Sequence, residues 1–104
     1  MVLPKSIMIG GRRVKIRIAP FKDPEGYTYG QYFHDEKTIQ LNDNMDDTQI
    51  LETLRHEMME AALLISGVGF SDAYEQEAVV RCMEEIFFPA WGVMFKKIAF
   101  NNEA

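Results

Sequence analysis

One stretch decides the fold of this 104-residue chain: Thr38-Ile39-Gln40-Leu41-Asn42, a short acidic connector, and then Ile50-Leu51-Glu52-Thr53-Leu54-Arg55-His56-Glu57-Met58-Met59-Glu60-Ala61. The first part alternates apolar and polar residues, which is typical of a strand with one buried face. From Gln49 to Ile65 the apolar residues recur at helical spacing and form one stripe, made of Leu51, Leu54, Met58, Ala61, Ala62 and Ile65. A strand followed closely by an amphipathic helix is therefore the predicted centre of the structure.

The residues before this stretch predict the rest of a small sheet. Residues 6–18 contain two apolar runs on either side of Gly10-Gly11, and this pattern predicts a hairpin because glycine accepts positive φ. A loop is expected over residues 19–26, a strand over Tyr27 to Phe33, and a polar turn from His34 to Lys37. We expect three or four strands in a small antiparallel sheet.

The residues after Asn42 predict helices. Asp46, Asp47 or Thr48 can cap the first long helix, and Gly67 and Gly69 are expected to end it. A second helix is expected from a cap at Ser71 or Asp72 to about Phe88, because Pro89 cannot continue a helix without a kink. A short third helix is expected over residues 90–99, followed by a frayed tail over 101–104. Strands come first and helices follow, so the predicted class is α+β, in one domain over residues 1–104.

Composition narrows the classes of function. The formal net charge is -5, which disfavours sequence-general binding to a phosphate backbone, so we expect a peptide or protein partner and no nucleic acid. The lone cysteine, Cys82, cannot form an internal disulfide, and mid-helix between apolar neighbours it is expected to be inert. Neither a secretory leader nor a membrane span is expected, which predicts a cytoplasmic protein. The oligomeric state is left open.

Two residues of the first helix have the spacing of metal ligands. His56 and Glu60 are four residues apart, so their side chains leave one face, opposite the apolar stripe, with Cβ atoms roughly 5–6 Å apart. A neutral imidazole and a carboxylate can both bind zinc. Glu57 is turned about 100° around the helix axis and is placed to deprotonate a water on the metal. An ordinary surface helix can show the same pattern, so the motif alone is weak.

The chain resembles a known family over residues 38–61 and, more loosely, from the opening hairpin to about Phe88. It is similar to the small metallopeptidase-like proteins of phages and prophages, related to the ImmA/IrrE type and to minimal gluzincins. These have a strand, a short connector and then Thr-Leu-x-His-Glu-x-x-His-Ala. The resemblance implies a zincin-like fold, a cytoplasmic location in a bacterial host, His56 and Glu60 as metal ligands and Glu57 as the catalytic base.

This chain departs from the family motif at Glu60, which stands where the family has its second His. A carboxylate there makes the site more anionic and favours harder ions. The expected ion is Zn²⁺, with Mn²⁺ less favoured, and the alternative is a site that has lost its metal. His34 can compensate as a ligand, or it is simply a polar turn residue.

The resemblance also implies a third ligand, a Glu on the following helix. The candidates are Glu75 and Glu77. The helical spacing groups Glu75 with the buried positions Ala78, Val79, Cys82 and Ile86, so Glu75 is preferred, although an exposed carboxylate in a first helical turn has a simpler explanation in the helix dipole. Glu77 groups with the solvated positions Arg81 and Glu84.

Two functions follow from these expectations. The first, which the resemblance implies, is a metal-dependent hydrolase, a peptidase, in which Thr38–Asn42 is the edge strand and the substrate lies along it by β-addition. The second is a catalytically inactive protein of the same fold that binds a host or phage protein. In an inactive protein, His56 and Glu60 are expected to pair with neighbours such as Arg55 or Arg81, and the site is expected to hold no metal. Trp91 and the phenylalanines near the C-terminus become a candidate docking patch only if they are exposed.

Overall fold

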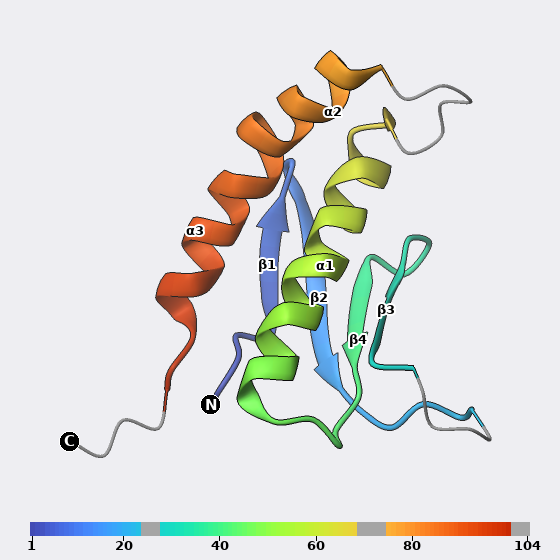
Figure 1. Ribbon diagram of the computed structural model, residues 1–104, viewed down its shortest axis with the longest axis vertical. Helices are drawn as coiled ribbons and strands as arrows, with labels where there is room; N and C mark the ends of the chain where they lie inside the picture. The colour runs from blue at the N-terminus through green and yellow to red at the C-terminus, as the bar shows by residue number, and fades with distance from the viewer. Residues whose placement is uncertain (24–27, 69–74, 101–104) are drawn as a thin grey trace.

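A computed structural model describes residues 1–23, 28–68 and 75–100 of the chain (Figure 1). The strands are β1 (Ser6–Ile9), β2 (Arg12–Ile18), β3 (Gly30–Phe33) and β4 (Thr38–Leu41). The helices are α1 (Asp47–Ile65), α2 (Gln76–Cys82), a π-helical segment η2 (Met83–Phe87) and α3 (Phe88–Lys97). The predicted α+β class, with strands before helices, is confirmed.

The sheet is mixed, so the prediction of an antiparallel sheet is wrong in one pairing. Its strand order is β1-β2-β4-β3, in which β1–β2 and β3–β4 are antiparallel but β2–β4 is parallel. The long connection after β2 carries the chain to the far edge, and the turn after β3 brings β4 back into the gap. Alternation along a strand reports which side chains are buried but not the direction of the neighbouring strand.

The prediction that Thr38–Asn42 forms the edge strand is also wrong. Strand β4 lies between β2 and β3, and all four of its residues are buried. The edge beside α1 is β3, whose expected start at Tyr27 falls outside the described residues. The predicted hairpin is confirmed, since Ile9 pairs with Arg12 and the two turn glycines both have positive φ, 56° and 77°.

Helix α1 begins where the sequence predicted. Asp46 is the N-cap, and its carboxylate accepts a hydrogen bond from the Gln49 backbone N–H at 2.8 Å. The Gln49 side chain accepts one in return from the Asp46 backbone N–H at 3.0 Å, which completes a capping box. The core-facing stripe is also confirmed, because Leu54, Met58 and two alanines are buried.

The expectation that Pro89 ends the second helix is wrong. Helix α2, segment η2 and helix α3 follow each other without a break (Figure 1). In η2 the backbone N–H of Phe88 donates to the Met83 carbonyl, five residues back, and this wider turn admits Pro89 at the start of α3. The described helix starts at Gln76, and the predicted boundaries at Gly69, Ser71 and Asp72 and the tail over 101–104 lie outside the described residues.

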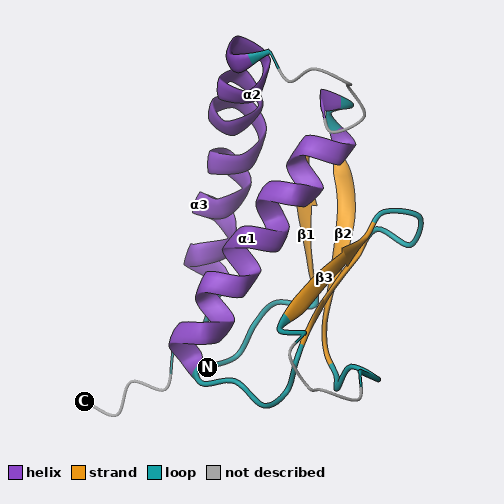
Figure 2. Cartoon of the chain, turned by 45° about the vertical axis from the view of Figure 1, so that its right-hand side comes forward, coloured by secondary structure: helices purple, strands orange, loops and turns teal. Residues whose placement is uncertain are grey.

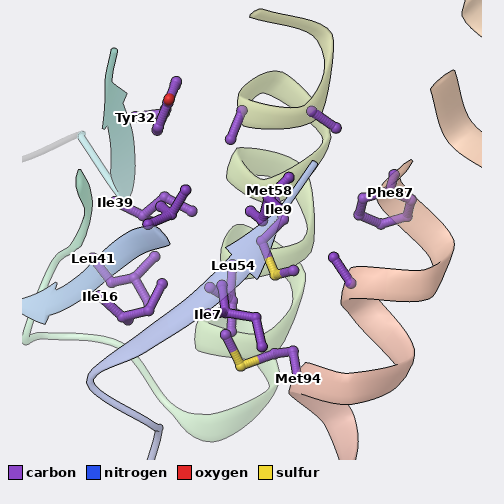
Figure 3. Packing of buried hydrophobic residues seen from close by; sticks show 14 of the residues in the cluster. Ile7, Ile9, Ile16, Tyr32, Ile39, Leu41, Leu54, Met58, Phe87 and Met94 are labelled. Atoms are coloured by element: carbon purple, nitrogen blue, oxygen red, sulfur yellow. The ribbon is translucent and has the colours of Figure 1, made fainter. Parts of the chain in front are cut away.

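The helices cover one face of the sheet (Figure 2). Helix α1 packs mainly on β3 and β4, and the continuous segment α2–η2–α3, called the second helix below, packs along β1. Apolar side chains from both layers meet between them in one core, which includes Ile7, Ile9, Ile39, Leu41, Leu54, Met58, Phe87 and Met94 (Figure 3). No helix in the described part of the chain is both long enough and apolar enough to cross a membrane.

A close approach between α1 and β3 sets the position of the candidate site. A Cβ atom on Gly30 would lie 2.5 Å from Cγ2 of Thr53, which is closer than two carbon atoms can pack. One helical turn from Thr53 advances about 6 Å to Glu57, and two residues along β3 advance about 6.6 Å to Tyr32. The glycine therefore lets helix and strand run side by side, with Glu57 beside Tyr32.

We predict that Gly30→Ala lowers the free energy of unfolding by about 1–3 kcal/mol, because α1 must move away from the edge strand. Gly92 is the matched control, since a Cβ there meets no atom within 4 Å. Gly92→Ala is expected to raise the stability of the monomer by up to about 1 kcal/mol through helix propensity. Urea unfolding of dilute protein measures both, and equal stability of Gly30→Ala and the wild type would contradict the close packing.

Candidate metal centre

Three side chains of α1 converge at its solvent-exposed side. His56, Glu57 and Glu60 each offer one ligand atom, and these atoms lie within 4.8 Å of one another. The closest pair is Nε2 of His56 and Oε1 of Glu60, 3.3 Å apart, and both side chains are more than half exposed. The structure thus brings together three of the four predicted site residues, on one helix.

The Glu57 carboxyl group differs from its two neighbours because it is buried, with an exposure of 5%. Among the described residues its Oε2 atom has no hydrogen-bond partner. Burial raises the pKa of Glu57 to about 7, and the adjacent Glu60 contributes through a shared hydrogen bond and through its negative charge. A hydrogen bond between two carboxyl groups requires one of them to be protonated, and burial selects Glu57 for the proton.

Glu57 faces the outer edge of β3. The Asn42 backbone N–H donates to the Tyr29 carbonyl at 2.8 Å, so in this antiparallel pair Gln31 and Phe33 bond to β4 while the backbone of Gly30 and Tyr32 points outward. The outward N–H of Tyr32 donates to the Glu57 carboxylate and lowers its pKa, partly offsetting burial. The carboxyl group therefore lies between the helix and an accessible strand edge.

The turn after β3 supplies a second imidazole near this edge. The Tyr32 hydroxyl and His34 Nδ1 are 3.0 Å apart, and the two rings meet edge to face. His34 therefore supports the buried Tyr32 ring. It does not belong to the three-residue cluster on α1.

The structure does not bring Glu75 to the cluster. Glu75 is the N-cap residue of α2 and is exposed, so the expectation that it lies on the buried stripe is wrong, because its extended backbone places it before the first helical turn. It lines a cleft of about 350 Å³ with Ser66, at the far end of α1 and about 15 Å along the helix from His56. Glu77 pairs with Arg81 at 3.4 Å and is exposed, as expected.

Sequence reasoning missed Gly30, Thr53 and the backbone of Tyr32, which position the carboxyl group. A glycine inside an otherwise aromatic strand was an available signal, since such a glycine often marks a close approach of another segment. No pattern in the sequence reports an outward-facing backbone N–H, which depends on strand pairing.

The donor set fits a divalent cation. Two ligands that bind one ion at about 2.0–2.1 Å with a tetrahedral angle between them are themselves about 3.3 Å apart. The separation of His56 Nε2 and Glu60 Oε1 has this value without any movement of the helix. A carboxylate oxygen of Glu57 lies within 4.8 Å of these two atoms and is the third possible ligand. Its buried Oε2 atom has no hydrogen-bond partner among the described residues and needs a proton, a water or a cation nearby.

Comparison of the chain with protein-family models, with curated proteins and with solved structures found no match.

We predict that Glu57→Gln stabilises the metal-free protein in a pH-dependent way. The folded-state pKa of about 7 lies above the usual value of 4.5, so the folded state holds its proton more tightly. That contribution is complete below about pH 4.5, declines between pH 4.5 and 7, and is absent above. By pH 8 the wild type should have lost about 3 kcal/mol relative to Glu57→Gln.

Urea unfolding from pH 4 to 8 with a chelator present measures this difference. Glu77→Gln, at an exposed carboxylate, is the matched control and should keep a nearly constant difference from the wild type. A Glu57→Gln difference that also stays constant with pH would show that the Glu57 carboxyl group has an ordinary pKa.

Proposed function

We propose that this protein is a zincin-like, metal-dependent hydrolase that acts on peptides, with the cation held by His56 and Glu60. The observation that carries the proposal is the 3.3 Å separation of their donor atoms beside a buried carboxyl group with a free oxygen. A surface ion pair accounts for the first feature but not for the second, because nothing in ion pairing requires a buried Glu57.

In this proposal Glu57 is the general base. A pKa of about 7 suits a group that must accept a proton and return it near neutral pH. The Glu57 carboxyl group, which is 5% exposed, would take a proton from the attacking water and then pass it to the leaving amine. A bound divalent cation supplies Lewis-acid polarisation of the scissile carbonyl and of the attacking water.

The substrate backbone would lie along β3. The outward N–H and C=O groups of Gly30 and Tyr32 can pair with an extended peptide in the manner of an added strand. This assigns to β3 the role that the sequence had suggested for Thr38–Asn42. An incoming peptide carbonyl would compete with Glu57 for the Tyr32 N–H, and that competition frees the carboxyl group for the reaction.

A second function, partner binding without catalysis, is favoured by a separate observation. Catalytic zinc sites usually have three protein ligands, and in the described part of the chain neither Glu75 nor any other residue of the second helix joins the cluster. His56 and Glu60 form an ion pair with each other. The pairing expected of an inactive site, with Arg55 or Arg81, is not seen among the described residues, where Arg81 pairs with Glu77. The β3 edge would then bind a protein segment and leave it intact.

Elemental mass spectrometry of protein purified without chelator, together with a peptide-cleavage assay, tests the proposal. We expect near-stoichiometric zinc or manganese in the wild type and its loss in His56→Ala. Glu57→Gln should keep the metal and lose cleavage by about 10²–10⁴-fold, the usual contribution of a general base.

Glu60→His is the informative companion variant, because it restores the family motif. If this variant gains zinc while the wild type holds no metal, the inactive partner-binding function is correct. If neither protein binds metal, both the metal centre and the family resemblance are wrong.

A further inference from the structure

The outer surface of the second helix exposes large apolar side chains. Phe88 is 57% exposed, Val93 47% and Phe95 50%, although α3 is packed against β1 on its other side. The half-buried Trp91 ring extends this surface, since it stacks on Phe87 at 6.4 Å and contacts Phe95 at 6.1 Å. Neighbouring exposed apolar side chains of this kind often mark a surface where another molecule binds.

The charges at the two ends of this surface are opposite. Glu84 and Glu85 lie at its start, Lys96 and Lys97 lie at its end, and all four are exposed. No other described residue forms an ion pair with any of them. An occupant that matches the surface therefore carries basic groups at one end, apolar groups in the middle and acidic groups at the other end.

A second copy of the same helix, running antiparallel, has this arrangement. If a two-fold axis passes between Ala90 and Trp91, positions equally distant from it face each other. On the exposed side of the helix, Glu85 then faces Lys96 and Pro89 faces Gly92, while Phe88 and Val93 lie at matching heights beside them. On this side an acidic residue therefore meets a basic one at each end, and the apolar centre meets the apolar centre of the other copy.

The side of the second helix that faces away from the sheet has small side chains in its middle. Glu85, Pro89, Gly92 and Lys96 recur at intervals of four, three and four residues, so they share one side, and all are exposed. A Cβ on Gly92 would meet no atom within 4 Å, so packing within the chain does not require this glycine. A mid-helix glycine costs about 1 kcal/mol relative to alanine, and here it allows another backbone to approach closely.

We propose that two copies of this protein associate through an antiparallel pairing of their second helices, with Gly92 and Pro89 at the crossing point. The interface is isologous and closes on itself, so it produces a dimer and not a filament. The helix from Gln76 to Lys97 is about 33 Å long, which provides an extended contact. Strand β3 lies beside α1, at the opposite edge of the sheet from this helix (Figure 1).

Variants that exchange the charges at positions 85 and 96 test this proposal. Sedimentation equilibrium over a wide range of protein concentration measures the dissociation constant of each dimer. Glu85→Lys and Lys96→Glu each replace two attractive pairs per dimer with two repulsive ones, and each should weaken the dimer by about tenfold or more. The double variant Glu85→Lys/Lys96→Glu restores opposite charges in reversed order, and should recover most of the wild-type affinity. Glu52→Lys, at an exposed position on α1, is the control for the change in charge and should have no effect.

A third variant tests the crossing point without altering charge. Gly92→Leu should abolish the dimer while circular dichroism still reports a folded, helical chain. The proposal is overturned if the wild type is monomeric at every concentration. It is equally overturned if the dimer persists unchanged in Gly92→Leu, or if the double variant is no tighter than the single ones, because the dimer then uses another surface.

Discussion

The burial of the Glu57 carboxyl group between α1 and β3 is the constraint on which the candidate site depends. A carboxylate in such a place loses hydration, so the protein must either protonate it or provide a positive charge. The Tyr32 N–H offsets part of this cost, and the neighbouring Glu60 adds to it. The protein therefore keeps a group that binds a proton near neutral pH where α1 packs beside the edge strand β3.

The rest of the fold holds this arrangement in place. The Asp46 capping box fixes where α1 begins, and the contact between Thr53 and Gly30 fixes how closely the helix approaches β3. Because β4 is buried between β2 and β3, it leads the chain from the sheet interior into α1 and leaves β3 as the free edge. The second helix packs on the β1 side, so the cluster on α1 is not covered from that direction.

Local features of the chain could be predicted from the sequence, and pairings between distant segments could not. The Gly10-Gly11 turn, the Asp46 cap and the stripe through Leu54 and Met58 follow from rules that act within a few residues, and all three are confirmed. The predicted position of Thr38–Leu41 at the edge of the sheet was wrong, because an edge strand and an inner strand can show the same alternation of apolar and polar residues. The predicted helix end before Pro89 was wrong because the π-helical segment Met83–Phe87 has no clear sequence signature. Its wider turn lets the helix continue through a residue that has no backbone N–H.

The candidate site shows the same division. Spacing alone placed His56 and Glu60 on one exposed face, and the structure confirms it. Spacing could not show that Glu57, the residue after His56, is buried against β3. That burial depends on Gly30, because a side chain there would keep α1 away from the strand. Glu75 was misplaced because the sequence did not reveal that it precedes the helix instead of joining its first turn.

The most direct test of this account is a carbon NMR titration of the Glu57 side-chain carboxyl group, assigned by comparison with Glu57→Gln, in chelator and then with added Zn²⁺. The account predicts a midpoint near pH 7 without metal and a lower midpoint once zinc is present, because the cation stabilises the ionised form. A midpoint near 4.5 that zinc does not change would contradict both the buried carboxyl group and the metal centre beside it.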